Sequence, residues 1–226
     1  MKTLAKLLVP AAVALTLSAC AHHNAPPPAD YAQLRAAHPR SILIIPVTNR
    51  STQVDAADNF LVTLARPLAE EGYYVFPTNM VKRTMEDEGL GDADMVHKSD
   101  VRRLASLFGA DAVLYAEVVN WDASYAILST TTTVSVNYEL KSGTTGNTLW
   151  KRTITAQYTP QANSGNPLAA LIASAITAAI QRAHPNYIPV ANAANARAFY
   201  EKDQGLLSGP YDQTPGSVPT REFLAQ

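Results

Sequence analysis

Ser41-Ile42-Leu43-Ile44-Ile45-Pro46-Val47 is the stretch that decides the fold of this chain. Four aliphatic residues in a row, without polar alternation, predict a central strand that is covered on both faces. A polar loop, Thr48-Asn49-Arg50-Ser51, follows at the carboxyl end of that strand, where many α/β proteins bind ligands. No glycine lets the backbone of this loop approach a phosphate, so we interpret it as a solvated loop and not as a nucleotide site.

Helices and strands alternate after this first strand. Capping residues and apolar periodicity indicate where each one begins and ends. The predicted elements are a helix over 55–71 that Pro67 kinks or interrupts, a strand over 73–76, a helix over 79–88, a helix capped by Ser99 and ended by Gly109, and a strand over 112–121.

An antiparallel meander comes next. Asp122-Ala123 is expected to turn the chain into a strand over 125–140, and residues 142–147 form a hairpin turn before a returning strand over 149–158. The five hydroxyl residues 129–133 favour an exposed sheet edge, where a partner protein binds by strand addition.

Residues 168–180 are apolar almost all round a helix, which predicts a deeply covered core helix. A membrane-surface helix is the rival interpretation, but the lysine-rich polar face of such helices is missing. If neither holds, the helix is an oligomer interface. Residues 191–202 read as a weak helix, and residues 205–226 as an extended arm.

The order β-α-β-α-α-β-β-β-α predicts the α/β class: a mixed sheet in a two-layer or three-layer sandwich. We expect a single domain over 41–184, followed by a carboxyl-terminal helix and arm over 185–226.

The amino terminus has the build of an export signal. Lys2 and Lys6 precede a short apolar run that is too short to span a membrane. Leu17-Ser18-Ala19-Cys20 looks like the lipobox of bacterial lipoproteins, which implies removal of residues 1–19 and lipidation of Cys20. Ala21, where aspartate would favour the inner membrane, resembles the outer-membrane sorting pattern. Residues 20–40 are then a lipidated, proline-rich tether.

Composition narrows the function. The 18 basic and 19 acidic residues leave no basic field for nucleic acid, and one cysteine allows no internal disulfide. Neither His22-His23 nor Glu86-Asp87-Glu88 has metal-ligand spacing. No catalytic motif contains any of the histidines, which are His22, His23, His38, His97 and His184. We therefore predict that the protein is not an enzyme and binds no metal and no cofactor.

Four short segments, in their order along the chain, carry a family resemblance; they are 42–48 (ending Pro-Val-Thr), Gly72-Tyr-Tyr-Val-Phe-Pro77, Gly109-Ala-Asp-Ala-Val-Leu114 and Ser208-Gly-Pro-Tyr211. They resemble the GNA-series family of Gram-negative lipoproteins, which is typically encoded beside a CsgG-like lipoprotein. The entry into the 112–121 strand is also similar to the CsgG, LpoB and TolB amino-terminal domains. The resemblance implies an outer-membrane lipoprotein that faces the periplasm and brings no catalytic residues.

The function we predict is that of a tethered, non-catalytic interaction module of the cell envelope. Its partners would be the membrane, through Cys20, a CsgG-like or other envelope lipoprotein, and further copies of itself. The binding surface would be the 129–133 edge, the Gly89-Leu90-Gly91 loop or the carboxyl arm. The alternative is a periplasmic carrier of a lipid or small molecule, with a cavity between the sheet and the 168–180 helix.

Overall fold

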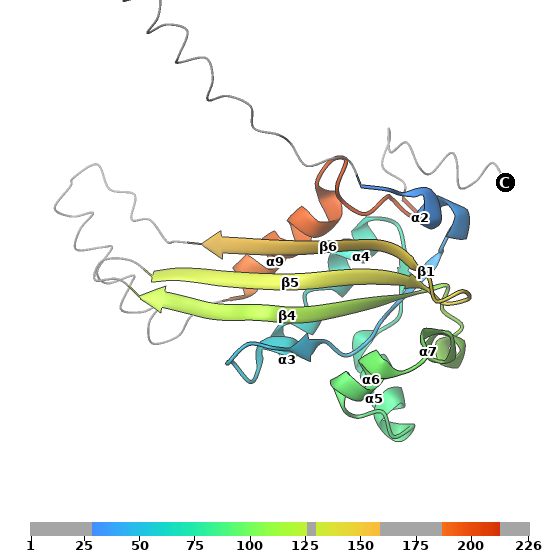
Figure 1. The fold of residues 1–226 in the computed structure, drawn as a ribbon, viewed down its shortest axis with the longest axis horizontal. Coiled ribbons are helices and arrows are strands. Elements are labelled where there is room, and N and C mark those ends of the chain that lie inside the picture. Colours follow the sequence, from blue (N-terminus) through green and yellow to red (C-terminus); the bar gives the residue numbers. More distant parts are fainter. Residues whose placement is uncertain (1–28, 126–129, 159–186, 213–226) are drawn as a thin grey trace, which may run out of the picture.

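A six-stranded mixed sheet is the centre of the fold (Figure 1). The computed structural model describes residues 29–125, 130–158 and 187–212. The strands along the sheet lie in the order β3 (Tyr74–Val75), β1 (Ser41–Ile44), β4 (Ala112–Tyr125), β5 (Thr130–Ser142) and β6 (Thr148–Tyr158). β3, β1 and β4 are parallel, β4 to β6 are antiparallel, and the short β2 (Thr48–Asn49) extends the parallel pairing along β4.

The first strand is buried on both faces, as its sequence predicts. Ile42 and Ile44 belong to the larger of two hydrophobic cores, whereas Leu43 and Ile45 belong to the smaller one on the opposite face. Since successive side chains of a strand point to opposite sides of the sheet, an unbroken apolar run is the pattern that both cores require.

The larger core lies between the sheet and three helices, α3 (Ala56–Leu61), α4 (Ala65–Glu70) and α9 (Ile188–Tyr200). Its centre is a cluster of aromatic rings whose centroids are 5.5–6.3 Å apart, in edge-on and tilted arrangements that favour attraction between rings. The rings are those of Phe60, Trp121, Tyr138 and Phe199. Another helix, α2 (Ala32–Ala37), contacts β6 and buries Leu34 completely.

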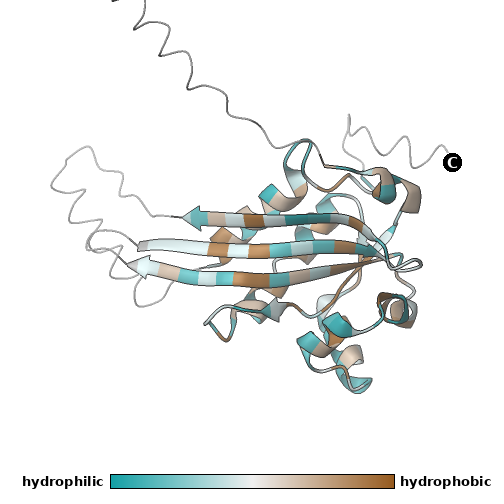
Figure 2. Ribbon diagram, viewed as in Figure 1, coloured by the Kyte–Doolittle hydropathy of each residue, from teal (hydrophilic) through white to brown (hydrophobic). Residues whose placement is uncertain are grey.

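The smaller core lies beneath α5 (Thr78–Asp87), α6 (Ala93–Lys98) and α7 (Val101–Phe108). These helices cover β1 and the start of β4, and no described helix lies in front of the long part of β4 to β6 in Figure 1. The protein is therefore a three-layer sandwich over its parallel strands and a two-layer one over β5 and β6, which confirms the predicted α/β class. Hydropathy along β4 to β6 shows the alternation of brown and teal bands that such half-covered strands require (Figure 2).

The helix predicted over 55–71 is two helices. α3 ends at Leu61 and α4 begins at Ala65, so the break comes before Pro67 and not at it. Pro67 is the third residue of α4, where the missing N–H costs little because the first turn has no internal acceptor for it.

The prediction that Ser99 caps a helix is wrong by one residue. The carboxylate of Asp100 accepts from the Arg102 N–H and caps α7, while the Ser99 hydroxyl donates to the Met95 carbonyl at the end of α6. Gly109, with φ of +69°, ends α7 as predicted. The sequence reasoning missed α6 itself, because a six-residue helix shows too little periodicity.

Two predictions about the meander are wrong. Asp122 and Ala123 do not turn the chain: both lie inside β4, paired with Thr133 and Thr132 of β5. Thr132 and Thr133 are not an edge either, because they pair with β4 on one side and with β6 on the other, whereas Thr130 and Thr131 pair with β4. Ser129 lies outside the described residues. The cross-strand pairs Trp121–Val134 and Ala123–Thr132 are buried, so the pairing of β4 with β5 continues beyond the expected turn.

The folded body extends past the range 41–184 at both ends. α9 supplies Val190, Ala194 and Phe199 to the larger core, and Leu206 is buried behind it. At the other end, the Ala29 N–H donates to the Asp203 carbonyl, and the Tyr31 hydroxyl donates to the Gly205 carbonyl at 2.6 Å. The helix predicted over 168–180 lies outside the described residues, so α9 is the helix that is seen to close this core.

A buried polar triad connects α9 to the rest of the larger core. The Asn195 amide, 1% exposed, donates to the hydroxyl of Thr63 at 2.9 Å and to its carbonyl at 3.1 Å, and accepts from the Tyr138 hydroxyl at 2.9 Å. Each group therefore has its partner, as buried polar groups require.

Asn195→Ala is expected to lower the free energy of unfolding by about 2–3 kcal/mol, because the buried Tyr138 hydroxyl loses its acceptor and the Thr63 carbonyl loses a donor, while the Thr63 hydroxyl still donates to the Phe60 carbonyl. Asn192→Ala is the matched control: Asn192 lies one turn earlier on α9 and is exposed, so its change stays within about 0.5 kcal/mol. Urea denaturation of the two variants measures the difference. Equal losses would contradict the role given to the triad.

Candidate functional site

A groove of about 760 Å³ lies where the helices α5 to α7 stop and the bare face of the sheet begins. One wall is the side of α6, and the floor is formed by the outward-facing residues of β4, β5 and β6. The side chains that decide its chemistry are His97, Tyr115, Glu117, Asn137, Glu139, Lys141, Lys151 and Thr153.

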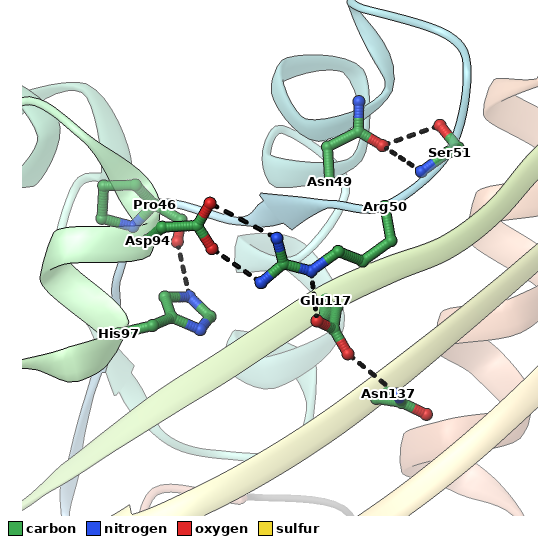
Figure 3. A network of polar contacts seen from close by, with 8 residues as sticks. All are labelled: Pro46, Asn49, Arg50, Ser51, Asp94, His97, Glu117 and Asn137. Atoms are coloured by element: carbon green, nitrogen blue, oxygen red, sulfur yellow. Dashed lines mark hydrogen bonds and ion pairs between the residues drawn. The ribbon is translucent and has the colours of Figure 1, made fainter.

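A chain of polar contacts runs from the segment after β2 to Glu117 and Asn137, which line the groove (Figure 3). Arg50, just after β2, binds Asp94 of α6 through two nitrogens at 2.7 and 3.3 Å, and its Nε binds Glu117 of β4 at 2.9 Å. Glu117 accepts in turn from the Asn137 amide at 3.1 Å, and Asn137 accepts from the Thr153 hydroxyl at 2.8 Å. Side chains from five separate segments are thus held in one line.

The charges of this line persist at neutral pH. Hydrogen bonds from Arg50 lower the pKa of Asp94. Burial acts to raise the pKa of Glu117, but the hydrogen bonds from Asn137 and Arg50 outweigh it and the pKa is lowered. Half of the Arg50 side chain is exposed, and such pairs contribute little to stability. The effect of these ion pairs is to hold Arg50, Asp94 and Glu117 in position.

His97 of α6 lines the groove, and its imidazole is neutral at pH 7. Its Nε2 donates to the Pro46 carbonyl at 2.9 Å (Figure 3). Its ring also meets the ring of Tyr115 edge-on, with the centroids 5.1 Å apart. Burial lowers the pKa of His97, and burial raises the pKa of Tyr115 to about 12. The sequence reasoning placed His97 in a polar loop; it is in fact on α6 and packs against the sheet.

We expect His97 to make the fold less stable in acid. Its pKa is depressed in the folded protein, so its contribution is complete above the unfolded value of about 6.5 and is lost as the pH falls below it. His97→Asn keeps a donor for the Pro46 carbonyl but does not titrate. Thermal denaturation at pH 7 and pH 5 should show a smaller acid loss in the variant than in the wild type, and an identical loss would contradict this.

The part of the groove around Glu139 carries charged side chains of both signs. The Lys141 ammonium lies 4.7 Å above the Tyr115 ring and 3.3 Å from Glu139. Glu139 also accepts from the Thr148 hydroxyl and faces Lys151 across the strand pair. A surface of this kind recognises a polar partner by hydrogen bonds and ion pairs. Within the groove, the described side chains do not form a nucleophile–base pair of the sort that catalysis needs.

The predicted lipidation site and the lipobox Leu17, Ser18 and Ala19 before it lie outside the described residues, as do His22, His23 and His184. In the described ranges, no group of three or more His, Cys, Asp or Glu residues could hold a metal ion. No described helix has the length and apolar character that crossing a bilayer requires.

Within the chain of polar contacts, no sequence motif indicates Asp94, Glu117, Asn137 or Thr153. Arg50 stands in the polar loop after the first strand, which the sequence did point out. Glu117 and Asn137 are polar residues on the outward face of alternating strands, and that position is also typical of a solvated surface. Nothing in the sequence separated the two cases.

The comparisons with known proteins identify the same family as the four short sequence segments. A family model described as "Putative lipoprotein GNA1162-like" matches residues 29–211, which is nearly the whole folded body. The chain belongs to the GNA1162-like lipoprotein family. This confirms the family named from the sequence.

The relatives cover most of the chain. A Neisseria meningitidis serogroup B protein, "Putative lipoprotein NMB1124/NMB1162", is 33% identical over 206 residues, 90% of this chain and 95% of the relative. The crystal structure of lipoprotein GNA1162 from Neisseria meningitidis is 35% identical, covers 64% of this chain and 99% of that chain, and has a TM-score of 0.52. The LpoB C-terminal domain from Salmonella enterica is 21% identical, with a TM-score of 0.41. That match covers 53% of this chain and 84% of the LpoB chain.

Proposed function

We propose that this protein is anchored by lipid on Cys20 at the periplasmic face of the outer membrane and serves there as a non-catalytic docking module for another envelope protein. Membership of a lipoprotein family supports the anchored part of this proposal. The lipobox supports the attachment point, and Ala21 supports the choice of membrane.

The groove is the observation that supports docking over catalysis. Its polar side chains are held by one another, with Arg50 shared between Asp94 and Glu117, and Asn137 held between Glu117 and Thr153. Such pre-positioned side chains lose little freedom when a partner binds. Since the groove carries lysines beside carboxylates, it suits a protein segment of mixed charge. A CsgG-like lipoprotein is the partner that we propose.

In-cell photo-crosslinking tests this assignment. A photoreactive phenylalanine analogue at Thr153, an exposed residue of the groove, should give an adduct that mass spectrometry identifies as an envelope lipoprotein. The same analogue at Asn192, exposed on α9, is the control and should give none. Arg50→Ala should weaken the adduct at position 153, because it releases Asp94 and Glu117.

Three outcomes would contradict the proposal. An adduct at position 192 with none at position 153 would place the docking surface on the other face. An adduct of twice the protomer mass would make the partner a second copy. Absence of adducts from several groove positions, in cells where the protein is anchored, would remove the docking role.

A further inference from the structure

The last described segment of the chain packs across the corner between α4 and β3. We call residues 205–212 the carboxyl arm. The Gly209 N–H donates to the Glu71 carbonyl at 2.6 Å, and the Tyr211 N–H donates to the Gly72 carbonyl at 2.9 Å. The Tyr73 hydroxyl donates to the Leu207 carbonyl at 2.7 Å. The arm is thus held mainly by backbone contacts to three consecutive residues of the corner.

The carboxyl group at this contact has an unusual setting. Glu71 is half-buried under the arm, and the Ser208 hydroxyl donates to its Oε2 at 3.2 Å. The nearest carboxylates are Glu70 beside it and Asp212 on the arm. The described structure shows no ion pair of Glu71, and the nearby cation, Arg66, is engaged by Glu70 at 2.7 Å.

We propose that the carboxyl arm is a proton-controlled latch, whose segment 208–212 is docked firmly when Glu71 is protonated and loosens when Glu71 ionises. Ionisation places a negative charge in a half-buried site between two other carboxylates, and undocking the arm returns that charge to water. The arm brings Asp212 with it, so release also separates two of the like charges.

The electrostatics of the corner agree with this direction. Burial raises the pKa of Glu71 to about 7, with Asp212 and Glu70 adding to the rise and the Ser208 hydrogen bond opposing it. The other titratable groups that sense Glu71 are Tyr73, next to it, and Tyr200 of α9, both neutral at this pH. The docked state is therefore favoured fully below pH 4.5, and the advantage is lost as the pH rises through about 7.

Hydrogen exchange tests the latch on the full protein as purified from cells. The protection factors of the Gly209 and Tyr211 amides should fall about tenfold between pH 6 and pH 8.5, after correction for intrinsic exchange rates. A tenfold change corresponds to one unit of the pKa shift of Glu71. The Arg50 amide, which donates to the Val118 carbonyl inside the sheet, should keep its protection and so exclude global unfolding.

Two variants test whether Glu71, and not its neighbour Glu70, controls the docking of the arm. Glu71→Gln should make the protection at Gly209 and Tyr211 independent of pH, whereas Glu70→Gln should leave the wild-type dependence. If Glu71→Gln does not fold, ¹³C titration of the Glu71 carboxyl in the wild type decides: a midpoint near 4.5 overturns the latch, and so does unchanged protection of the two arm amides across the pH range.

Discussion

Cys20→Ala is expected to move the protein from the membrane fraction to the soluble fraction and to abolish incorporation of radiolabelled palmitate. Each buried CH₂ of an acyl chain contributes about 0.8 kcal/mol, and two or more chains hold a protein on a bilayer for long periods, whereas none leaves it soluble. The effect should be close to complete, because the acyl chains on Cys20 are the membrane attachment that we propose. Fractionation with sodium carbonate washing measures it.

Ala21→Asp is the matched control for this result. It leaves the proposed acylated residue in place, so labelling and membrane association should persist. By the Gram-negative sorting pattern, the variant should move from the outer to the inner membrane on a sucrose gradient. Retention of the Cys20→Ala protein in washed membranes, or intact residues 1–19 on the mature wild-type chain, would contradict the lipoprotein anchor proposed here.

Gly72→Ala is expected to lower the free energy of unfolding by about 3 kcal/mol or more, or to expel the carboxyl arm. Gly72 has φ of +82°, which costs a residue with a side chain about 1–2 kcal/mol. A Cβ at this position would also lie 2.2 Å from the backbone nitrogen of Asp212, much closer than atoms in contact can approach. Both costs act together, so the change should be far larger than an average surface substitution.

Gly89→Ala isolates the backbone part of that cost. Gly89 has a similar φ of +77°, but a Cβ there would meet nothing within 4 Å. Urea denaturation should therefore show a loss of about 1 kcal/mol at position 89 and a clearly larger one at position 72. Equal losses would mean that the arm does not depend on its close approach to this glycine.

The close approach brings together two separated segments that both carry the family resemblance. Gly72-Tyr73 and Gly209-Pro210-Tyr211 lie against each other, and a Cβ on Gly209 would in turn lie 2.5 Å from the Gly72 carbonyl oxygen. The other two segments are neighbouring strands, in which Ile42 lies opposite Ala112, and Ile42 also lies opposite Val75 of the segment that begins at Gly72. The four motifs are thus connected through the three parallel strands.

Most elements could be predicted because their signals are local. The unbroken apolar run at 42–45, the glycine at the end of α7 and the alternation in β5 each reflect the burial or backbone geometry of a few neighbouring residues. The hairpin at 142–147 is equally local, and Gly146 there has φ of +80°. The errors at Asp122 and at Ser99 arose where the deciding partner lay on another segment or one residue away.

From the sequence alone came the α/β class, the family and the prediction of an anchor at Cys20, because strand periodicity, short motifs and an export signal are each written in consecutive residues. Only the tertiary structure decided that β5 is an inner strand, that α9 closes the core, and that one chain of contacts links Arg50, Asp94, Glu117 and Asn137. Those facts depend on contacts between residues up to 132 positions apart along the chain, as in the bond from Asn195 to Thr63. Local patterns do not encode such pairing, because many partners would satisfy the same polar side chain.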